Sequence, residues 1–590
     1  MVSCREKDFV GDCHLPFDTL ILQPLRPSQV MTFLVRAYTL LQDGSDGVQK
    51  AENRFWQLAG GDAIRQVWAR WREASEDLDL FWGANTIPEN NPDVERHLSW
   101  DDKALWWEVR FDPRSLLRLA SNPYLLTIIT ALPQVSSNRA QLFQGFLQHL
   151  YRREHAAREK RHERNIPDQA NWEAVLEMLA EAMQRTVNAT QAEGVQTALP
   201  LTQCPDGLTR ELLDFAIDAS VVQVKDDTIR FTHQLLQEYL ASRLFLDASS
   251  TGCKRAADFW PQNSWWERTG WEVVAEIAGE SCGRDTDARR QLIAWLAKAN
   301  PEVACEVWQH VGRPELPQVV QAAISDQWFA RMTDVSLEPD PRARAAIGRA
   351  LGNWHLDRRK GVGLRADGLP EIDWVEIQSA TFIYQDAEHP PLPPFSIARY
   401  PVTNTQFQAF IDAGGYQDEQ WWRGLAERFD APESPSWNEP NSPRETVSWF
   451  EAIAFCRWLS AQLGFDVNLP TEQQWERAAR GTGRYAYPWG YVFKENYANA
   501  EWQIGKTTAV GLYPQAATSD GVLDMAGNVW EWCLNEYANP ENCQLSGNGR
   551  RVLRGGSWVN SGRSCRSANR ILHDPSDHNY SPGFRLARGH

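Results

Sequence analysis

The sequences Arg551-Val-Leu-Arg-Gly-Gly-Ser-Trp558 and Gly583-Phe-Arg-Leu-Ala-Arg588 bracket a segment of unusual composition near the end of the chain. From Val559 to Pro582 this segment contains no Lys, Glu, Gln, Met or Trp, although the chain holds 28 Trp. Every residue type that does occur there has a codon ending in a pyrimidine. Mutagenesis of Asn codons at their adenines would leave this composition. The segment therefore predicts a displayed binding surface rather than a catalytic centre.

Length and charge limit the class of protein. With 590 residues the chain is expected to hold several domains, because single hydrophobic cores stop growing at about 250–300 residues. Its formal net charge of −17 argues against sequence-independent binding to nucleic acid or anionic membrane, since both need a positive field. No apolar run approaches the length of a membrane span. Neither nucleic acid nor a membrane is therefore predicted as a partner.

The cysteines and the first residues indicate a compartment. The 10 Cys show neither CxxC nor metal-ligand spacing, so free thiols in a reducing cytosol are favoured over a disulfide framework. The sequence Met1–Lys7 has no apolar region of the signal-peptide type. We therefore predict a cytoplasmic protein.

Residues 1–250 are predicted to be mostly helical. Met1–Arg5 is expected to form a short strand, and Pro27–Leu41 opens a helix. In Ser121–Leu132 a Pro near the first turn precedes a nearly continuous apolar run, which predicts a buried helix. Apolar residues at helical spacing predict a further core face at Leu142, Phe143, Phe146, Leu147 and Leu150.

Two further segments complete this half. Tyr151–Arg164 carries alternating charges, which are typical of a solvated helix rather than a nucleic-acid patch. Val221–Phe231 predicts a β-hairpin with Asp226 and Asp227 at its turn. A helix over Thr232–Arg243 is expected to follow, and this hairpin and helix suit a winged-helix unit.

Three of these elements carry a specific resemblance. The run that begins Phe231-Thr-His-Gln, the Asn122-Pro-Tyr-Leu-Leu helix and the opening Ser3-Cys-Arg-Glu resemble NACHT-type signalling ATPases of the STAND class. The resemblance implies that Arg5 lies on the sensor strand, that Pro123 packs near the adenine and that His233 reaches a nucleotide phosphate. The alternative for His233 is a capping or core histidine.

The sequence departs from that family at the phosphate site. It contains no G-x-x-x-x-G-K-[ST] loop and no acidic strand end for Mg²⁺. The Gly-rich stretches Ala59–Asp62 and Gly481–Gly483 lack the Lys that a phosphate loop needs. We expect a degenerate or truncated ATPase, as if the chain began at the sensor strand. Neither ATP nor ADP is expected to bind this chain alone.

Residues 251–360 are predicted to be helical and are rich in Trp, with amphipathic stretches at Trp266–Ala278 and Arg289–Ala297 and a short helix at Arg342–Leu351. Stacked HEAT-like helix pairs are expected, although the sequence shows no clean repeat period. The Trp side chains are predicted to form core rather than a ligand cage. Asp357–Pro370 is predicted to be a linker.

From Glu371 onward the pattern changes to short strands and turns. Trp374–Ile383 predicts strand, turn and strand, and helices are expected at Thr403–Ala413 and Ser448–Leu463. The second helix opens with Ser448 followed three residues later by Glu451, which predicts a capping box.

Seven motifs then occur in order: Arg399–Phe407, Thr446–Ala452, Leu469–Arg480, Tyr487–Gly490, Asp524–Trp532, Arg554–Trp558 and Gly583–Arg585. Together they resemble the formylglycine-generating-enzyme (sulfatase-modifying factor) family. The resemblance implies a variant of the C-type lectin fold. The predicted fold class is multidomain α+β, with NACHT-like helices at 1–250, HEAT-like helices at 251–360 and this domain at 371–590.

The chemistry of that family needs a pair of thiols near the Gly-Gly-Ser element, which bind copper and activate oxygen; soft Cu(I) prefers thiolates. Between Gly556 and Arg570 the chain offers only Cys565. The related iron-dependent sulfoxide synthases need a His-rich helical partner domain, which the sequence does not show. No catalytic residue is predicted, and the chain is not expected to be an enzyme.

A calcium cofactor is expected from the same resemblance. It assigns the ligands to Gly527, Asn528, Val529 and Glu531, whose carbonyl and carboxylate oxygens suit Ca²⁺. A second site at Asn499-Ala500 is not expected, because the downstream Asp is absent. The alternative for Asn528 and Glu531 is turn capping without a metal.

This domain, with its segment of unusual composition near the end of the chain, also resembles the variable proteins of diversity-generating retroelements. In those proteins a static main chain carries diversified side chains. The variable ligand-binding positions would be Val559, Asn560, Ser561, Ser564, Asn569, Ile571, Leu572, His573, His578, Asn579, Tyr580 and Ser581. The scaffold positions would be Trp558, Arg566, Ala568, Arg570, Asp574, Pro575 and Gly583–Arg585. The alternative is an ordinary polar surface loop.

These inferences predict a sensor whose C-terminal domain binds a protein ligand of unknown identity and whose NACHT-like part relays or scaffolds that event. The alternative is an enzyme, either a formylglycine-type oxidase or an ATPase that lacks only its upstream segment.

Overall fold

The computed structural model describes residues 24–41, 46–72, 76–83, 99–111, 115–132, 138–163, 165–189, 198–579 and 581–589. The chain forms two compact units, one of Met1–Phe245 with Val273–Gly283 and one of Leu246–Glu272 with Arg284–His590. The predicted strand Met1–Arg5 lies outside the described residues. Within the described part of the chain, no helix has the length and apolar character that a bilayer span requires.

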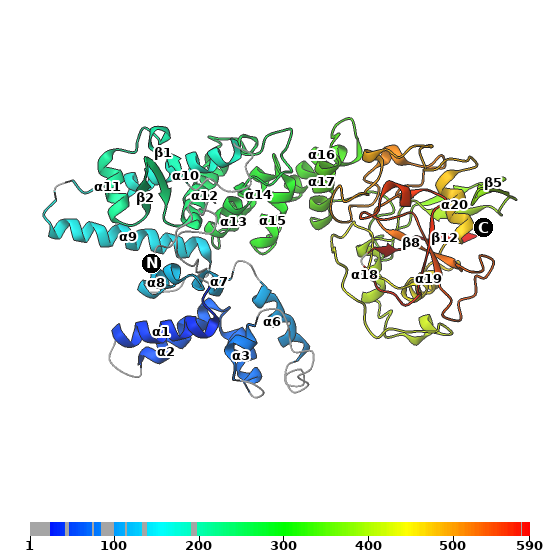
Figure 1. The fold of residues 1–590 in the computed structure, drawn as a ribbon, viewed down its shortest axis with the longest axis horizontal. Helices are drawn as coiled ribbons and strands as arrows, with labels where there is room; N and C mark the ends of the chain where they lie inside the picture. The colour runs from blue at the N-terminus through cyan, green and yellow to red at the C-terminus, as the bar shows by residue number, and fades with distance from the viewer. Residues whose placement is uncertain are drawn as a thin grey trace, which may run out of the picture. The chain divides into compact units, whose positions relative to one another are not determined.

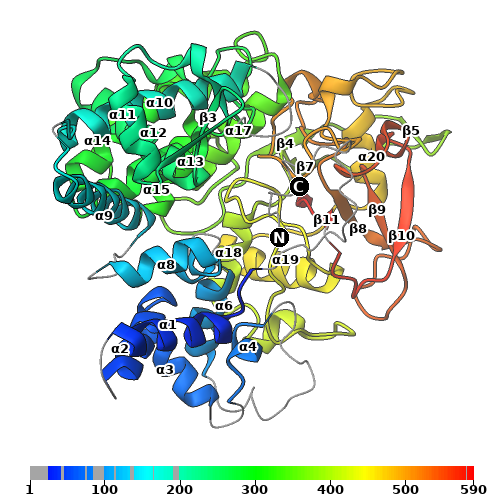
Figure 2. The same ribbon diagram turned by 60° about the vertical axis from the view of Figure 1, so that its left-hand side comes forward.

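The first unit is mainly helical, and α1 packs along α2 (Figures 1 and 2). The predicted helices at Pro27–Leu41 and after Asn122 are confirmed as α1 and α8, and the predicted core face at Leu142–Leu150 lies buried on α9. The helices are α1 (Pro27–Leu41), α2 (Asp46–Leu58), α3 (Asp62–Trp71), α4 (Leu78–Phe81), α6 (Trp100–Phe111), α7 (Leu116–Ala120), α8 (Pro123–Ala131), α9 (Arg139–Lys160), α10 (Gln169–Ala189), α11 (Arg210–Asp218), α12 (Gln234–Thr251) and α13 (Trp271–Ser281).

The predicted hairpin is confirmed. β2 (Val222–Lys225) pairs with β3 (Thr228–Phe231), and β1 (Leu199–Pro200) adds to the other edge of β3. Asp226 and Asp227 have φ of 48° and 55°. Two successive positive φ values make the tight turn whose twist matches that of the flanking strands. The hairpin leads directly into α12, as the sequence predicts.

The charged end of α9 differs in part from the predicted solvated helix. Arg158 is buried and binds Glu154 at 3.1 Å and Asp218 at 2.7 Å. Its guanidinium also lies over the Phe215 ring. The alternating charges on this helix therefore include a packed ion-pair cluster against α11 as well as a hydrated face.

The helices of the second unit that precede its C-terminal domain are α14 (Thr286–Ala297), α15 (Pro301–His310), α16 (Gln318–Thr333) and α17 (Pro341–Asn353). The prediction that Trp side chains form core here is confirmed for Trp260, Trp265 and Trp328, which are at most 2% exposed. The helix predicted from Trp266 begins later, at Trp271, because Gly270 with φ of 88° precedes it.

The prediction that Asp357–Pro370 is a linker is wrong. The Asp357 carboxylate binds Arg359 at 2.7 Å and accepts from Asn441 Nδ2 at 2.8 Å, and both charged side chains are nearly buried. Gln406 Nε2 donates to the Gly361 carbonyl at 3.1 Å. The segment is rich in Gly and charge, but these contacts make it part of the C-terminal domain.

The C-terminal domain is built from two main sheets, of strand order β10-β9-β8-β11 and β12-β7-β4, and a small β5-β6 pair. Figure 2 shows β8, β9 and β10 side by side. The strands of the C-terminal domain are β4 (Trp374–Ile377), β5 (Phe382–Tyr384), β6 (Ala387–His389), β7 (Phe395–Ala398), β8 (Trp530–Glu536), β9 (Arg551–Arg554), β10 (Arg570–His573), β11 (Pro582–Gly583) and β12 (Ala587–Gly589).

Three helices, α18 (Asn404–Asp412), α19 (Trp449–Leu463) and α20 (Glu472–Arg480), accompany the sheets. Each begins with a capping box, and the one predicted from Ser448 and Glu451 is confirmed. The apolar stripe of α19 packs with Phe407 and Phe584 in one core cluster. A cap fixes where each helix starts, so the polar residues next to α19 have set positions.

Gly352 supplies a test of how α17 packs on this domain. A Cβ at Gly352 would lie 2.4 Å from Asn441 Oδ1. We predict that Gly352→Ala lowers the stability of the second unit by about 1–3 kcal/mol through overpacking, measured by urea unfolding. Gly363→Ala is the control, since its Cβ would meet nothing within 4 Å. Equal stability of the two variants would contradict the packing.

Candidate functional site

A fully buried ion pair fixes the end of the chain. Arg585 follows β11, and its Nη2 and Nε donate to the Glu531 carboxylate on β8 at 2.7 and 2.5 Å. Both side chains are 0% exposed. Trp475 on α20 donates its Nε1 hydrogen to the same carboxylate at 2.7 Å. Since neither charge reaches water, each depends on the other for stabilisation.

A second buried network holds the other side of the segment. Arg554, the last residue of β9, binds Glu476 of α20 and donates Nη1 to the Asn569 carbonyl at 2.9 Å. Glu472 of the same helix pairs with Arg570 at 2.7 Å. The predicted scaffold residue Arg570 is therefore held in place by its charge partner.

Both the backbone angles and the neighbouring residues of the Gly-Gly element after β9 require glycine. Gly555 and Gly556 have φ of 94° and 74°, which L residues with a Cβ rarely adopt. A Cβ on Gly556 would also lie 2.7 Å from Cys565 Sγ. Glycine is needed here so that the chain can turn from β9 into the segment beginning at Trp558.

The main chain between these two networks is bound to the scaffold along its length. β10 pairs with β9 over four residues, Arg570↔Arg554 to His573↔Arg551. The carbonyls of Pro575, Asn579 and Ser581 accept from the backbone N–H groups of Trp449, Thr446 and Trp530 at 2.9, 3.1 and 2.9 Å. The Asn560 carbonyl accepts from the backbone of Glu501 at 2.9 Å. These bonds use backbone atoms of the segment and do not depend on its side chains.

The predicted variable side chains differ in exposure. Ser561 and Leu572 are exposed, and Leu572 is 39% exposed. Two asparagines support the local turns, because Asn560 Oδ1 accepts from Ser557 Oγ at 2.6 Å and Asn569 Nδ2 donates to the Ser564 carbonyl at 2.9 Å. Tyr580 lies outside the described residues. The half-buried positions are Val559, Asn560, Ser564, Asn569, Ile571, His573, Asn579 and Ser581.

The predicted scaffold side chains also differ in exposure. Trp558 and Pro575 are buried and Ala568 is half-buried, whereas Arg566 and Asp574 are exposed. Asp574 binds Ser576 Oγ at 2.6 Å and closes a local turn. Arg566 and Asp574 are therefore part of the displayed surface, although sequence reasoning assigned them to the scaffold.

His578 was predicted on the displayed surface, but the structure places it largely inside. Its side chain is 11% exposed, and Nε2 lies 2.6 Å from Glu451 Oε2 on α19. Burial works against the charged imidazole, but the hydrogen bond and charge of Glu451 outweigh it and raise the pKa of His578. Burial likewise opposes the charge on Glu451, yet His578 holds the pKa of that carboxyl below its usual value. His578 anchors the segment to the α19 cap.

The side-chain oxygens of Asn528 and Glu531, two of the residues assigned to calcium, accept hydrogen bonds within the protein. Both oxygens of Glu531 are occupied by Arg585 and Trp475. Asn528 Oδ1 accepts from the Thr508 backbone at 3.0 Å and from Asn499 Nδ2 at 3.1 Å. Gly527 and Val529 lie in the connecting turn, where Gly527 has φ of 80°. These contacts match the alternative of turn capping together with a buried ion pair, and the calcium site stays a prediction.

The thiols of the domain lie in separate places. Cys565 is buried beside Gly556, and burial raises its pKa to about 12. Cys456 is in α19 and Cys533 is in β8, and both are buried. In the part of the chain that the structure describes, no group of three or more His, Cys, Asp or Glu could hold a metal ion.

The structure describes Pro123 and His233 among the residues that the NACHT resemblance assigns to nucleotide binding. Arg5 lies outside the described residues, and Pro123 begins α8. His233 and Asn122, the residue before Pro123, line one pocket of about 630 Å³ with Arg139 and Glu238. Burial raises the pKa of Glu238 to about 7, against the lowering effect of a hydrogen bond from Gln234. His233 Nδ1 also accepts from the Leu235 backbone at 3.2 Å, as a capping histidine would.

Sequence reasoning missed an exposed aromatic surface next to the segment. Trp502 is 62% exposed, its backbone donates to the Trp558 carbonyl at 2.9 Å, and the two rings meet edge to face at 4.7 Å. Tyr485 and Tyr491 are 43% and 68% exposed, with ring centroids 5.2 Å apart.

Comparison with known proteins places residues 374–590 in the Sulfatase-modifying factor enzyme 1-like domain family. Inactive C-alpha-formylglycine-generating enzyme 2 of Mus musculus is 31% identical over 245 residues, which are 33% of this chain and 75% of that protein. Through these residues the chain belongs to the sulfatase-modifying factor family. It combines a helical first half with a lectin-like mixed α/β domain.

Other relatives differ in function. Hercynine oxygenase of Mycobacterium tuberculosis is 34% identical over 236 residues, 33% of this chain and 53% of that protein, so the chain spans about half its length. Among solved structures, Treponema denticola variable protein 1 is 25% identical with a TM-score of 0.30, covering 38% of this chain and 97% of that one. PvdO from Pseudomonas aeruginosa is 24% identical with a TM-score of 0.31, covering 39% and 100%.

The His578–Glu451 pair predicts a pH-dependent stability. The folded pKa of His578 is raised above its ordinary value of 6.5, so the stabilisation is complete below that value and is lost as pH rises through the folded pKa. We predict that His578→Gln lowers the free energy of unfolding by about 1–2 kcal/mol near pH 6, with a smaller difference at alkaline pH. Urea unfolding across this range measures the difference.

The matched control is Ser561→Ala, which alters an exposed side chain of the same segment. A difference between wild type and His578→Gln that stays constant from pH 6 upward would show that the ion pair does not stabilise the fold.

Proposed function

We propose that the C-terminal domain is a ligand-binding module that presents the side chains of 559–581, and that its ligand is a protein. The observation that carries this proposal is the set of backbone hydrogen bonds to Asn560, Pro575, Asn579 and Ser581. Because these bonds do not involve the side chains, exposed residues between them such as Ser561 and Leu572 are open to replacement without loss of the main-chain path. The composition of the segment supports the same conclusion.

The surface around the segment suits protein recognition. Leu572 on β10 and the rings of Trp502 and Tyr491 are exposed apolar and aromatic groups, and Ser561 and Arg566 are exposed polar ones. Aromatic residues and Arg are enriched in protein interfaces and supply most binding hot spots. A fixed aromatic surface next to replaceable positions would give affinity, while the replaceable positions would give specificity.

The diversification itself makes a direct prediction at the level of DNA. The DNA near the gene is expected to hold a near-copy of codons 551–588 that differs from the gene at adenines, together with a reverse transcriptase. Sequencing of the flanking DNA is the test. If neither is present, the segment is an ordinary surface loop and the diversification proposal fails.

The first half of the chain is proposed to be the C-terminal portion of a NACHT-type signalling module that relays or scaffolds ligand binding in the cytoplasm. The hairpin that leads into α12 and the pocket shared by His233 and Asn122 support this proposal. Since the sequence lacks a phosphate loop with its Lys, hydrolysis of ATP by this chain is not expected.

We further propose that the domain does not act as an oxidase. The family reaction needs two neighbouring thiols, whereas Cys565 is the only Cys between Gly556 and Arg570. Copper titration of the whole protein with an oxygen electrode is predicted to show no uptake above that of a Cys565→Ser variant. Uptake that depends on Cys565 would overturn this proposal and favour the alternative of a formylglycine-type oxidase.

The separation of scaffold from displayed side chains predicts contrasting effects of substitution. Ser561→Tyr and Leu572→Ser change exposed positions and are expected to alter the free energy of unfolding by about 0.5 kcal/mol or less each. Arg554→Met removes one of the two arginines that bind Glu476, which is 0% exposed and keeps Arg480 as a partner, and is expected to cost about 1.5–3 kcal/mol. Urea unfolding measures the free energy of unfolding of all three variants. If all three lose a similar amount, the buried network does not contribute more to stability than the exposed side chains do.

A further inference from the structure

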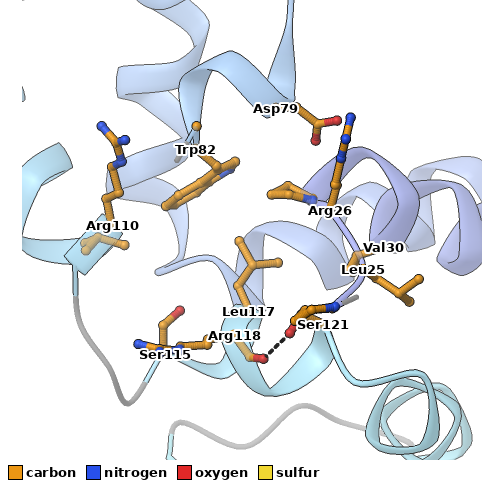
Figure 3. A pocket seen from close by; sticks show the side chains of 14 residues that line it. Leu25, Arg26, Val30, Asp79, Trp82, Arg110, Ser115, Leu117, Arg118 and Ser121 are labelled. Carbon is orange, nitrogen blue, oxygen red and sulfur yellow. Dashed lines mark hydrogen bonds between the residues drawn. The ribbon is translucent and has the colours of Figure 1, made fainter. Parts of the chain in front are cut away.

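The first unit contains a cavity of about 740 Å³ between the start of α1, the residues after α4, the end of α6 and α7. We call it the arginine pocket, because Arg26, Arg110 and Arg118 line it from three of these elements. In the view of Figure 3, the side chains of Trp82 and Leu117 lie between those of Arg110 and Arg26. Its volume lies within the usual range for small-molecule sites, about 300–1,000 Å³.

The charges around the arginine pocket are not balanced. Its only carboxylate among the described residues is Asp79, whose two oxygens accept from the backbone N and the Oγ of Ser28 at 2.9 and 2.6 Å. Asp79 therefore caps the N-terminus of α1. Within the described part of the chain, neither Arg26 nor Arg118 lies within ion-pair distance of an acidic group, so the pocket keeps a positive field.

Arg110 shows that the pocket is partly shielded from water. Its guanidinium lies 4.8 Å from the ring centroid of Trp106 and 5.8 Å from that of Trp107. Burial lowers the pKa of Arg110. A cation held over aromatic rings away from water interacts more strongly with an arriving anion than an exposed one does.

The arginine pocket also has an apolar wall. Val30 and Leu117 are 0% and 7% exposed, and Trp82 presents an indole ring to the same space. The Trp82 Nε1 hydrogen is buried and has no acceptor among the described residues. Buried N–H groups nearly always have a partner, so a ligand with an acceptor oxygen would complete this site.

We propose that the arginine pocket binds a small organic anion with a flat apolar body and a phosphate or carboxylate group. Guanidinium groups bind such oxygens through two parallel hydrogen bonds. The flat body would contact Leu117 and the Trp82 ring, and the anionic group would lie toward the arginines. This site is separate from the displayed surface of the C-terminal domain, and its proposed role does not depend on that surface.

The test uses three probes that separate charge from shape, with the full chain in isothermal calorimetry at low ionic strength. 2-Naphthyl phosphate carries both features, 2-naphthol only the flat body and inorganic phosphate only the charge. We expect 2-naphthyl phosphate to bind at least tenfold more tightly than either single-feature probe, a difference of about 1.4 kcal/mol. Added salt should weaken the binding.

Variants locate the binding in the pocket. Arg26→Gln and Arg118→Gln alter exposed residues and should each weaken 2-naphthyl phosphate binding about tenfold. Trp82→Phe keeps a ring but removes the N–H and should also weaken binding about tenfold. Arg72→Gln is the control, since this side chain is 58% exposed in the same unit and does not line the pocket. No binding at about 1 mM probe, equal affinity for the phosphate and the naphthol, or an equal loss in Arg72→Gln would each overturn the proposal.

Discussion

The buried pair of Arg585 and Glu531 is the constraint on which the C-terminal domain depends. Two charges with 0% exposure are expensive to bury and are stable only as a complete set. Arg585 also donates to the carbonyls of Ala398 and Leu523 at 3.0 and 2.9 Å, and Glu531 accepts from Trp475. One ion pair thus ties the last residues of the chain to β7, β8, α20 and the turn before β8. The fold can close only when all of these segments are in place.

The pair holds the segment without using the exposed side chains that we propose to act in recognition. Arg585 fixes the chain after the segment 559–581, and Arg554 with Glu476 fixes it before the segment. Between them, β10 and the backbone hydrogen bonds set the path. The segment is therefore held largely by backbone hydrogen bonds and buried charges, to which the side chains of His578, Asn560 and Asn569 add local contacts. A surface built in this way tolerates many sequences, which supports a role in recognition.

Sequence reasoning identified local features well and long-range partners poorly. The capping box of Ser448 and Glu451 and the hairpin turn at Asp226 and Asp227 depend on residues a few positions apart, so the pattern was sufficient. The ion pair of Glu531 was not predicted because its partner Arg585 is 54 residues away in sequence. His578 was assigned to the surface because Glu451 is 127 residues away. The NACHT-like and calcium assignments came from family resemblance, and Asp357–Pro370 was misassigned because composition does not reveal the contacts with Asn441 and Gln406.

The positions of the thiols bear on whether this domain serves catalysis or, as we propose, recognition. A metal-binding or nucleophilic cysteine acts as a thiolate, and burial of Cys565 raises its pKa to about 12, so that it is protonated at neutral pH. In this domain the same residue fills space beside Gly556, where a side chain is excluded. Packing at this position needs only a small apolar group, whereas oxidase chemistry needs a second thiol beside it. The Gly-Gly turn and the buried ion pairs do not involve a second thiol, so the fold of the domain does not depend on one.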